Sequence, residues 1–198
     1  MKPLRVHAGI ALACSLVHDA YHVHRGAPVD LLWLCNVAVP LIAFGCLRSR
    51  RAVAVGLTWL GFGTPLWLLS LVTGANVIPT SPLVHVVAPL VALDALRRLG
   101  WPARTWPRAI AGSFALLVAT RLLGIPDGNV NLMFGIQRGF DATFHASYAL
   151  FLGAVVATSV VWAIAFDVVM TRALGNRLRS AACTTTHAPV KTSEVPRR

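Results

Sequence analysis

The basic residues of this chain are concentrated after every second apolar stretch. The first group follows a stretch that ends near residue 47, the second a stretch that ends near residue 96, and the third lies beyond residue 170. The groups are Arg48, Arg50 and Arg51; Arg97, Arg98, Arg104 and Arg108; and Arg172, Arg177, Arg179, Lys191, Arg197 and Arg198. Lysine and arginine are enriched in the cytoplasmic loops of membrane proteins. The pattern predicts a multi-pass protein of the plasma (inner) membrane with both termini in the cytoplasm.

The composition favours the same class of protein. Of 198 residues, 56% are hydrophobic and 13% are charged, and that charged share is about half of what soluble domains carry. A bilayer can cover so much apolar surface, whereas a single soluble core cannot. The net charge of +11 does not indicate nucleic acid binding, because the basic residues lie in short loops and form no continuous face. Anionic lipid headgroups are the expected partner.

The apolar stretches predict an all-α fold with six transmembrane helices in one bundle. Each membrane span needs about 20 apolar residues. The expected spans cover residues 6–20, 28–47, 52–72, 77–96, 107–125 and 144–170. They form one domain, residues 1–180. Residues 181–198 lack an apolar period and are expected to be a disordered cytoplasmic tail.

On this topology, most hydrophilic residues fall in the external half of the bundle. Ionisable groups inside a bilayer are costly and mark functional sites, so a polar cavity open to the external leaflet is expected. The alternative is that these side chains only join helices by hydrogen bonds. In the cytoplasmic half, Asp94 and Asp167 are expected to form ordinary ion pairs with nearby arginines. The external set is His18, Asp19, His22, His24, Asp30, Cys35, Asn36, Asn76, Thr80, Ser81, His85, Arg121, Asp127, Asn129, Asn131, Gln137, Arg138, Asp141 and His145.

Cys35 and His85 are the candidate catalytic pair. With a rise of about 1.5 Å per residue, they lie about 10 and 12 Å below the external ends of their spans, at similar depths. A neighbouring imidazole can remove the thiol proton and create a nucleophilic thiolate. Asn36 is expected to orient a carbonyl or the histidine, and Arg121 to hold a phosphate. This set predicts acyl transfer to or from a phospholipid, although a cysteine is commonly a small core residue.

A second candidate site contains His18 and His22. The two histidines are four residues apart and share one face of a helix. Together with His145 they could bind zinc or another divalent metal, which would indicate a metal-dependent membrane hydrolase. The Cys35 chemistry requires no cofactor.

Several short motifs resemble those of YwaF-like integral membrane proteins. Residues 31–36 (Leu-Leu-Trp-Leu-Cys-Asn) are similar to the Leu-Pro-Leu-His-Leu-Cys segment of that family, and residues 63–65, 81–85 and 129–131 follow the order of its later motifs. The chain lacks the proline and histidine before the cysteine and has Val-Asn where the family has tyrosine. The resemblance implies a fold shared with a cysteine-dependent phospholipid acyltransferase, in which Cys35 bears the acyl group and His85 is its base. It places Asn129 and Asn131 at the substrate. The androgen-induced lipid hydrolases, which have a similar helical fold, imply a lipid-ester hydrolase as well.

A non-catalytic function is the main alternative. The basic loops and tail could hold a soluble protein, such as a transcription factor, at the cytoplasmic face, so that the chain acts as a membrane regulator or sensor. The lack of a strong catalytic motif favours this hypothesis. The expected partners are therefore membrane lipid and, for the regulator, a cytoplasmic protein.

Overall fold

The computed structural model describes residues 4–72, 78–123, 126, 129–137 and 140–185, with side chains as far as Leu174. Within these ranges the chain is all-helical, as predicted, with no β-strand. The α-helices are α1 (Arg5–His24), α2 (Leu34–Arg48), α3 (Arg50–Val72), α4 (Ala88–Leu99), α5 (Trp106–Leu123) and α6 (Tyr148–Thr185). Three single-turn helices join them: η1 (Pro28–Leu32), the π-helical turn η2 (Leu83–Val87) and η4 (Val130–Leu132).

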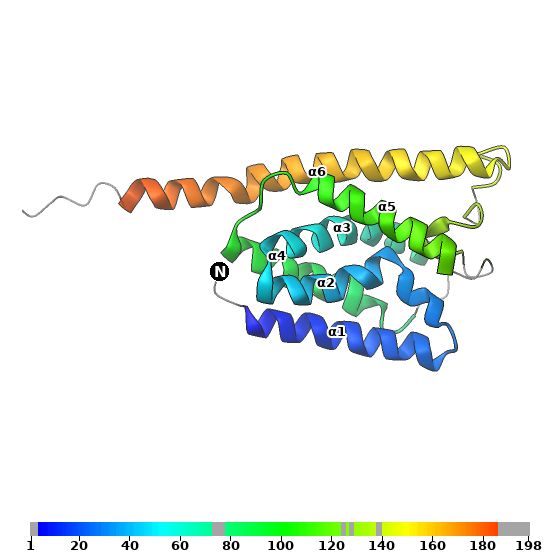
Figure 1. Ribbon diagram of the computed structural model, residues 1–198, viewed down its shortest axis with the longest axis horizontal. Coiled ribbons are helices and arrows are strands. Elements are labelled where there is room, and N and C mark those ends of the chain that lie inside the picture. Colours follow the sequence, from blue (N-terminus) through cyan, green and yellow to red (C-terminus); the bar gives the residue numbers. More distant parts are fainter. Residues whose placement is uncertain (1–3, 73–77, 124–125, 127–128, 138–139, 186–198) are drawn as a thin grey trace, which may run out of the picture.

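Each of the six predicted segments overlaps one of the six α-helices (Figure 1), but α2 begins six residues later than predicted, at Leu34, and α4 covers only the second half of the predicted 77–96 segment and ends at Leu99. α6 is longer than predicted, because it continues to Thr185 and includes residues 181–185 of the predicted tail. The rest of that tail lies outside the described residues. In the ribbon, α1 lies along one side of the molecule, α5 and α6 lie along the other, and α2, α3 and α4 lie between them.

Two helices are long and apolar enough to cross a membrane: α3, and α6 from Tyr148 to Leu174. Large apolar side chains on the outer helices face away from the core. Leu122 on α5 is 77% exposed, and Val161 on α6 is 65% exposed. A water-soluble protein rarely presents extended apolar surface of this kind. The helix lengths and this surface are consistent with contact with a membrane.

Small residues allow α2 and α3 to pack closely as an antiparallel hairpin. A Cβ atom on Gly45 of α2 would lie 2.5 Å from the backbone nitrogen of Val53, and one on Gly56 of α3 would lie 2.9 Å from the carbonyl oxygen of Ala38. Both distances are too short for a real side chain. Glycine at these positions therefore lets the two backbones meet, as is common in membrane bundles.

The basic connections meet at one end of the bundle. The Leu4 amide donates to the Cys46 carbonyl at 2.9 Å, and Arg50 Nη1 donates to the Leu99 carbonyl at 3.3 Å. These two bonds bring the start of α1 to the end of α2, and the start of α3 to the end of α4. Asp94 pairs with Arg98 at 3.0 Å, as expected, and also with His7 at 2.7 Å.

The expectation for Asp167 was wrong. Its carboxylate accepts from Trp101 Nε1 at 2.6 Å and from the Thr105 amide at 3.3 Å, both neutral donors. Asp167 is only 6% exposed, so its hydrogen-bonding capacity must be met inside the protein. It therefore fastens the α4–α5 connection to α6 and is not a surface ion pair.

We expect Trp101→Phe to lower the free energy of unfolding by about 2 kcal/mol, because a buried carboxylate loses a donor. Thermal unfolding in detergent would measure the change. Trp106→Phe is the matched control, since Trp106 is 38% exposed and should tolerate the change. Equal melting temperatures for the two variants would show that the Asp167 contact contributes little.

Candidate functional site

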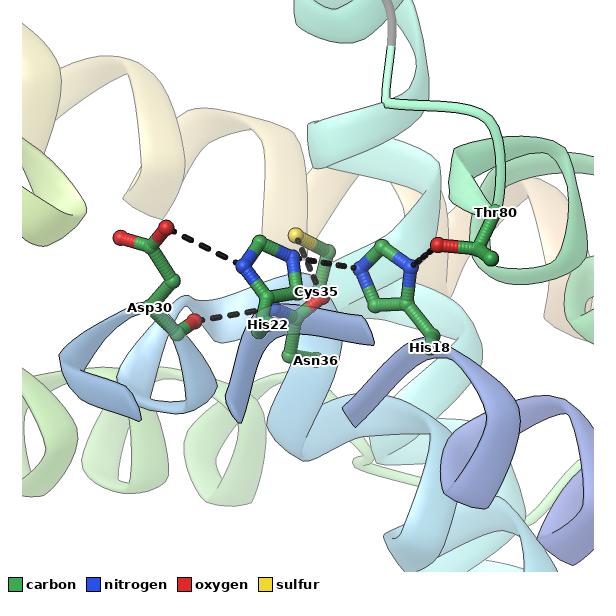
Figure 2. A network of polar contacts seen from close by, with 6 residues as sticks. All are labelled: His18, His22, Asp30, Cys35, Asn36 and Thr80. Atoms are coloured by element: carbon green, nitrogen blue, oxygen red, sulfur yellow. Dashed lines mark hydrogen bonds and ion pairs between the residues drawn. The ribbon is translucent and has the colours of Figure 1, made fainter. Parts of the chain in front are cut away.

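A continuous chain of polar contacts joins α1, η1 and the residues before η2 (Figure 2). Thr80 Oγ1 lies 2.7 Å from His18 Nδ1, His18 Nε2 lies 3.1 Å from His22 Nε2, and His22 Nδ1 lies 3.1 Å from Asp30 Oδ2. His18 and His22 are 3% and 4% exposed. Both rings are thus shielded from water, and each ring nitrogen faces a protein group.

Local sequence explains how these groups meet. His18 and His22 are one helical turn apart on α1, so their rings project from the same face and form an edge-to-face pair with centroids 4.6 Å apart. Gly26, with a φ of +73°, turns the chain after α1, and Pro28 starts the short helix η1 that carries Asp30. The return of the chain thus places a carboxylate beside His22.

Cys35 and Asn36 extend the polar cluster into α2 (Figure 2). Asn36 Nδ2 donates to the Asp30 carbonyl at 2.8 Å, and Asn36 Oδ1 accepts from the Cys35 thiol at 3.7 Å. Asn36 also lies beside the His18 ring. Asn36 therefore links the thiol to the histidine chain.

A proline sets the backbone around His85. Pro89 has no N–H, so the His85 carbonyl four residues earlier loses its α-helical donor, and the chain forms the π-helical turn η2 at this point. Thr64 of α3 replaces the missing donor, with its hydroxyl 3.3 Å from that carbonyl. The proline and the threonine thus fix η2 against α3.

The His85 side chain is buried against Trp67 of α3. The rings stack with centroids 4.9 Å apart and an interplanar angle of 8°. His85 is 8% exposed, and its Nδ1 has no hydrogen-bond partner among the described residues. His85 also lies close enough to His18 for an electrostatic interaction. A buried ring nitrogen without a partner is unusual and indicates a group that interacts with something else.

Gly63 lies close to both Cys35 and His85. A Cβ atom at this glycine would lie 3.6 Å from Cys35 Cβ and 3.9 Å from His85 Cε1. The structure therefore places both residues of the candidate pair beside one small residue, while the hydrogen-bond partner of the thiol is Asn36.

Asn131 binds the backbone on both sides of Trp33. Its Oδ1 accepts from the Leu34 amide at 2.8 Å, and its Nδ2 donates to the Leu32 carbonyl at 2.7 Å and to Thr120 Oγ1 at 2.9 Å. Its φ of +52° is a left-handed conformation that asparagine tolerates. The side chain thus caps the junction of η1 and α2, next to Cys35.

Two other predicted substrate-binding residues hold the connection between α5 and α6. Asn129 Oδ1 accepts from the amides of Phe134 and Gly135 at 3.0 and 2.9 Å. Arg121 donates to the Met133 carbonyl at 3.4 Å and lies over the Phe134 ring at 5.1 Å. In the described part of the chain, their partners belong to this connection and not to Cys35 or His85.

The predicted metal set is not assembled. His18 and His22 are in contact, but His145 is exposed, and its φ of +50° places it in an irregular turn before α6. Within the described ranges, no group of three or more His, Cys, Asp or Glu side chains could hold a metal ion. The spacing of His18 and His22 correctly predicted a shared face, but the chain distance to His145 gave no information about its position.

Sequence reasoning overlooked the specific roles of four residues around the predicted pair. Thr80 is the partner of His18, Asp30 is the partner of His22, Trp67 stacks on His85, and Gly63 lies beside both Cys35 and His85. The spacing of Pro89 four residues after His85 was a usable signal, because it predicts a free carbonyl at the histidine. The other contacts join separate helices and have no signature in the sequence.

Comparison with known proteins adds no assignment, since no family model, characterised protein or solved structure matches the chain. The chemistry of the site must therefore be inferred from its own side chains. These side chains include a thiol, three buried histidines and a carboxylate, which lie on α1, η1, α2 and η2.

We expect Asn131→Ala to lower the free energy of unfolding by about 2–4 kcal/mol, because three hydrogen bonds are lost and alanine is strained at this φ. Asn131→Asp should recover part of the loss, because it keeps the acceptor for the Leu34 amide and tolerates the backbone. Thermal unfolding in detergent would test both variants. An Asn131→Ala protein that melts like the unmodified protein would contradict the capping role.

Proposed function

We propose that this protein is a six-span membrane enzyme that transfers or hydrolyses the acyl chains of lipids, with both termini in the cytoplasm. The separation of charge supports this topology. The basic connections meet at one end of the bundle, whereas the histidine cluster lies at the other end of α1. In this arrangement the reacting groups open towards the external leaflet.

The unpartnered Nδ1 of His85, which lies with Cys35 beside Gly63, is the observation that favours this function. A movement that brought the imidazole to the thiol would let His85 accept the thiol proton. The thiolate would attack the ester carbonyl of a lipid to form a thioester, and the departing alkoxide would take the proton from His85. A second hydroxyl, from another lipid or from water, would then accept the acyl chain.

A small apolar cavity of about 20 Å³ lies between α3, α5 and α6, and its lining includes Leu34, Phe62, Phe114, Leu117 and Trp162. Leu34 and Phe62 are the chain neighbours of Cys35 and Gly63. A cavity of this size holds about one water molecule, so an acyl chain would have to widen it or reach Cys35 from the apolar outer surface of the bundle. Arg121, exposed on the α5–α6 side, would meet the lipid phosphate.

We expect Cys35→Ala to lower acyl transfer at least 100-fold, because the nucleophile is removed. The assay would use the purified protein in vesicles with a fluorescent phospholipid, together with mass spectrometry of a hydroxylamine-sensitive acyl adduct on Cys35. Cys14→Ala is the control, since Cys14 is a buried free cysteine on α1. Unchanged transfer in Cys35→Ala would rule out the thiol as the nucleophile.

Gly63→Ala tests the space beside the pair without deleting either group. The added methyl group makes ordinary van der Waals contacts with Cys35 and His85, and alanine stabilises a helix by about 0.5–1 kcal/mol relative to glycine. We therefore expect unchanged or higher stability but a loss of acyl transfer of up to roughly 100-fold, the effect that a misplacement of reacting groups by about 1 Å can have. Gly153→Ala is the control, because a Cβ there meets nothing within 4 Å. Full activity in Gly63→Ala would show that Cys35 and His85 need not approach each other.

A further inference from the structure

The contacts of His18 and His22 allow a network of hydrogen bonds that runs in one direction. With Asp30 ionised, the carboxylate can only accept, so His22 must donate through Nδ1. A neutral His22 then accepts at Nε2, and His18 must donate through its own Nε2. A neutral His18 therefore accepts at Nδ1, and its partner there is the Thr80 hydroxyl, 2.7 Å away. The network thus runs in one direction, from Thr80 through His18 and His22 to Asp30.

We propose that Thr80 is a second nucleophile, activated by His18 and directed at carboxylic esters of amphiphilic molecules. The arrangement meets the geometric criterion for an activated hydroxyl, since the nucleophile is in hydrogen-bond reach of a base that a third group orients. His22 and Asp30 are the positioning residues: they orient His18 and can accept its displaced proton. This site goes beyond the proposed function, because it does not use Cys35.

The reaction balances without any further reactant except water. Thr80 Oγ forms a bond to the ester carbonyl as its proton moves to His18 Nδ1, and the His18 Nε2 proton moves to His22 Nε2. The resulting imidazolium of His22 is stabilised by Asp30. Collapse of the intermediate breaks the bond to the departing alkoxide, which recovers the proton through His18. Water then hydrolyses the acyl-threonine by the same route.

The position of Thr80 suits this role. The residue is only partly buried, so its hydroxyl is not enclosed like the two imidazoles. It directly precedes the helical segment that begins at Ser81, where the helix dipole favours negative charge on a reacting oxygen. Asp30, with 24% of its side chain exposed, connects the other end of the relay with solvent.

Labelling with a long-chain alkyl fluorophosphonate would test the proposal on the full-length protein in detergent. The expected result is a stoichiometric phosphonate adduct on Thr80, located by peptide mass spectrometry. The adduct should persist in Cys35→Ala and in the distant control Ser113→Ala. Thr80→Val should abolish it, Thr80→Ser should label within about tenfold of the unmodified rate, and His18→Asn should label at least 100-fold more slowly.

The positioning residues have a separate readout. Asp30→Asn should slow labelling at least tenfold and change its pH profile, whereas Asp30→Glu should restore both. Absence of an adduct on Thr80, or equal labelling of Thr80→Val, would overturn the proposal. Binding of one zinc ion per chain that is lost in His18→Asn would also overturn the proposal, because the metal would replace the hydrogen bond between the two Nε2 atoms. The two proposals can fail separately. If Cys35 forms a hydroxylamine-sensitive acyl adduct but Thr80 is never labelled, the proposed function stands and only this inference is removed.

Discussion

The hydrogen bonds from Asn131 to the backbone on either side of Trp33 are the constraint on which the site depends. Trp33 interrupts the helix between η1 and α2, with φ and ψ of −57° and 136°, and such an interruption inside an apolar bundle leaves backbone groups without partners. Asn131 satisfies the Leu32 carbonyl and the Leu34 amide. Because the break is stabilised, η1 can turn Asp30 towards His22 while α2 presents Cys35 towards α3. Loss of this cap would disturb Asp30 and Cys35 together.

On the opposite side of the site, too, a side chain satisfies a backbone group that a helix break leaves without a partner. Pro89 frees the carbonyl of His85, and Thr64 supplies the donor that the helix lacks. The resulting π-helical turn holds the His85 ring flat against Trp67. Breaks in helical hydrogen bonding therefore occur at two places in the site, and each is satisfied by a side chain from a different helix. Irregular backbone of this kind, buried in protein, is where membrane proteins place binding and reacting groups.

Much of the fold could be predicted, because it depends on patterns that are local in the chain. Each predicted apolar segment overlaps an α-helix, and the pairing of Asp94 with Arg98 follows from their i, i+4 spacing. The interpretation of Asp167 as an arginine partner was wrong, since its partners come from the α4–α5 connection. The predicted metal set is not assembled in the part of the chain that the structure describes: His18 and His22 share a helix face, but His145 belongs to a turn whose position no local pattern predicts. Four residues of the predicted external set, His18, His22, Asp30 and Thr80, form a chain of hydrogen bonds.

The sequence by itself determined the helices, the sorting of positive charge to one end of the bundle, and the shared face of His18 and His22, because each follows from composition or helical period over a few turns. Only the tertiary structure decided which polar groups meet. It joined Thr80 to His18 and Asp30 to His22, and it placed Cys35 and His85 beside Gly63. The reason is physical: inside an apolar bundle a buried polar group without a partner is costly, so nearly all of them are paired. That partner is chosen by the crossing of helices far apart in the chain.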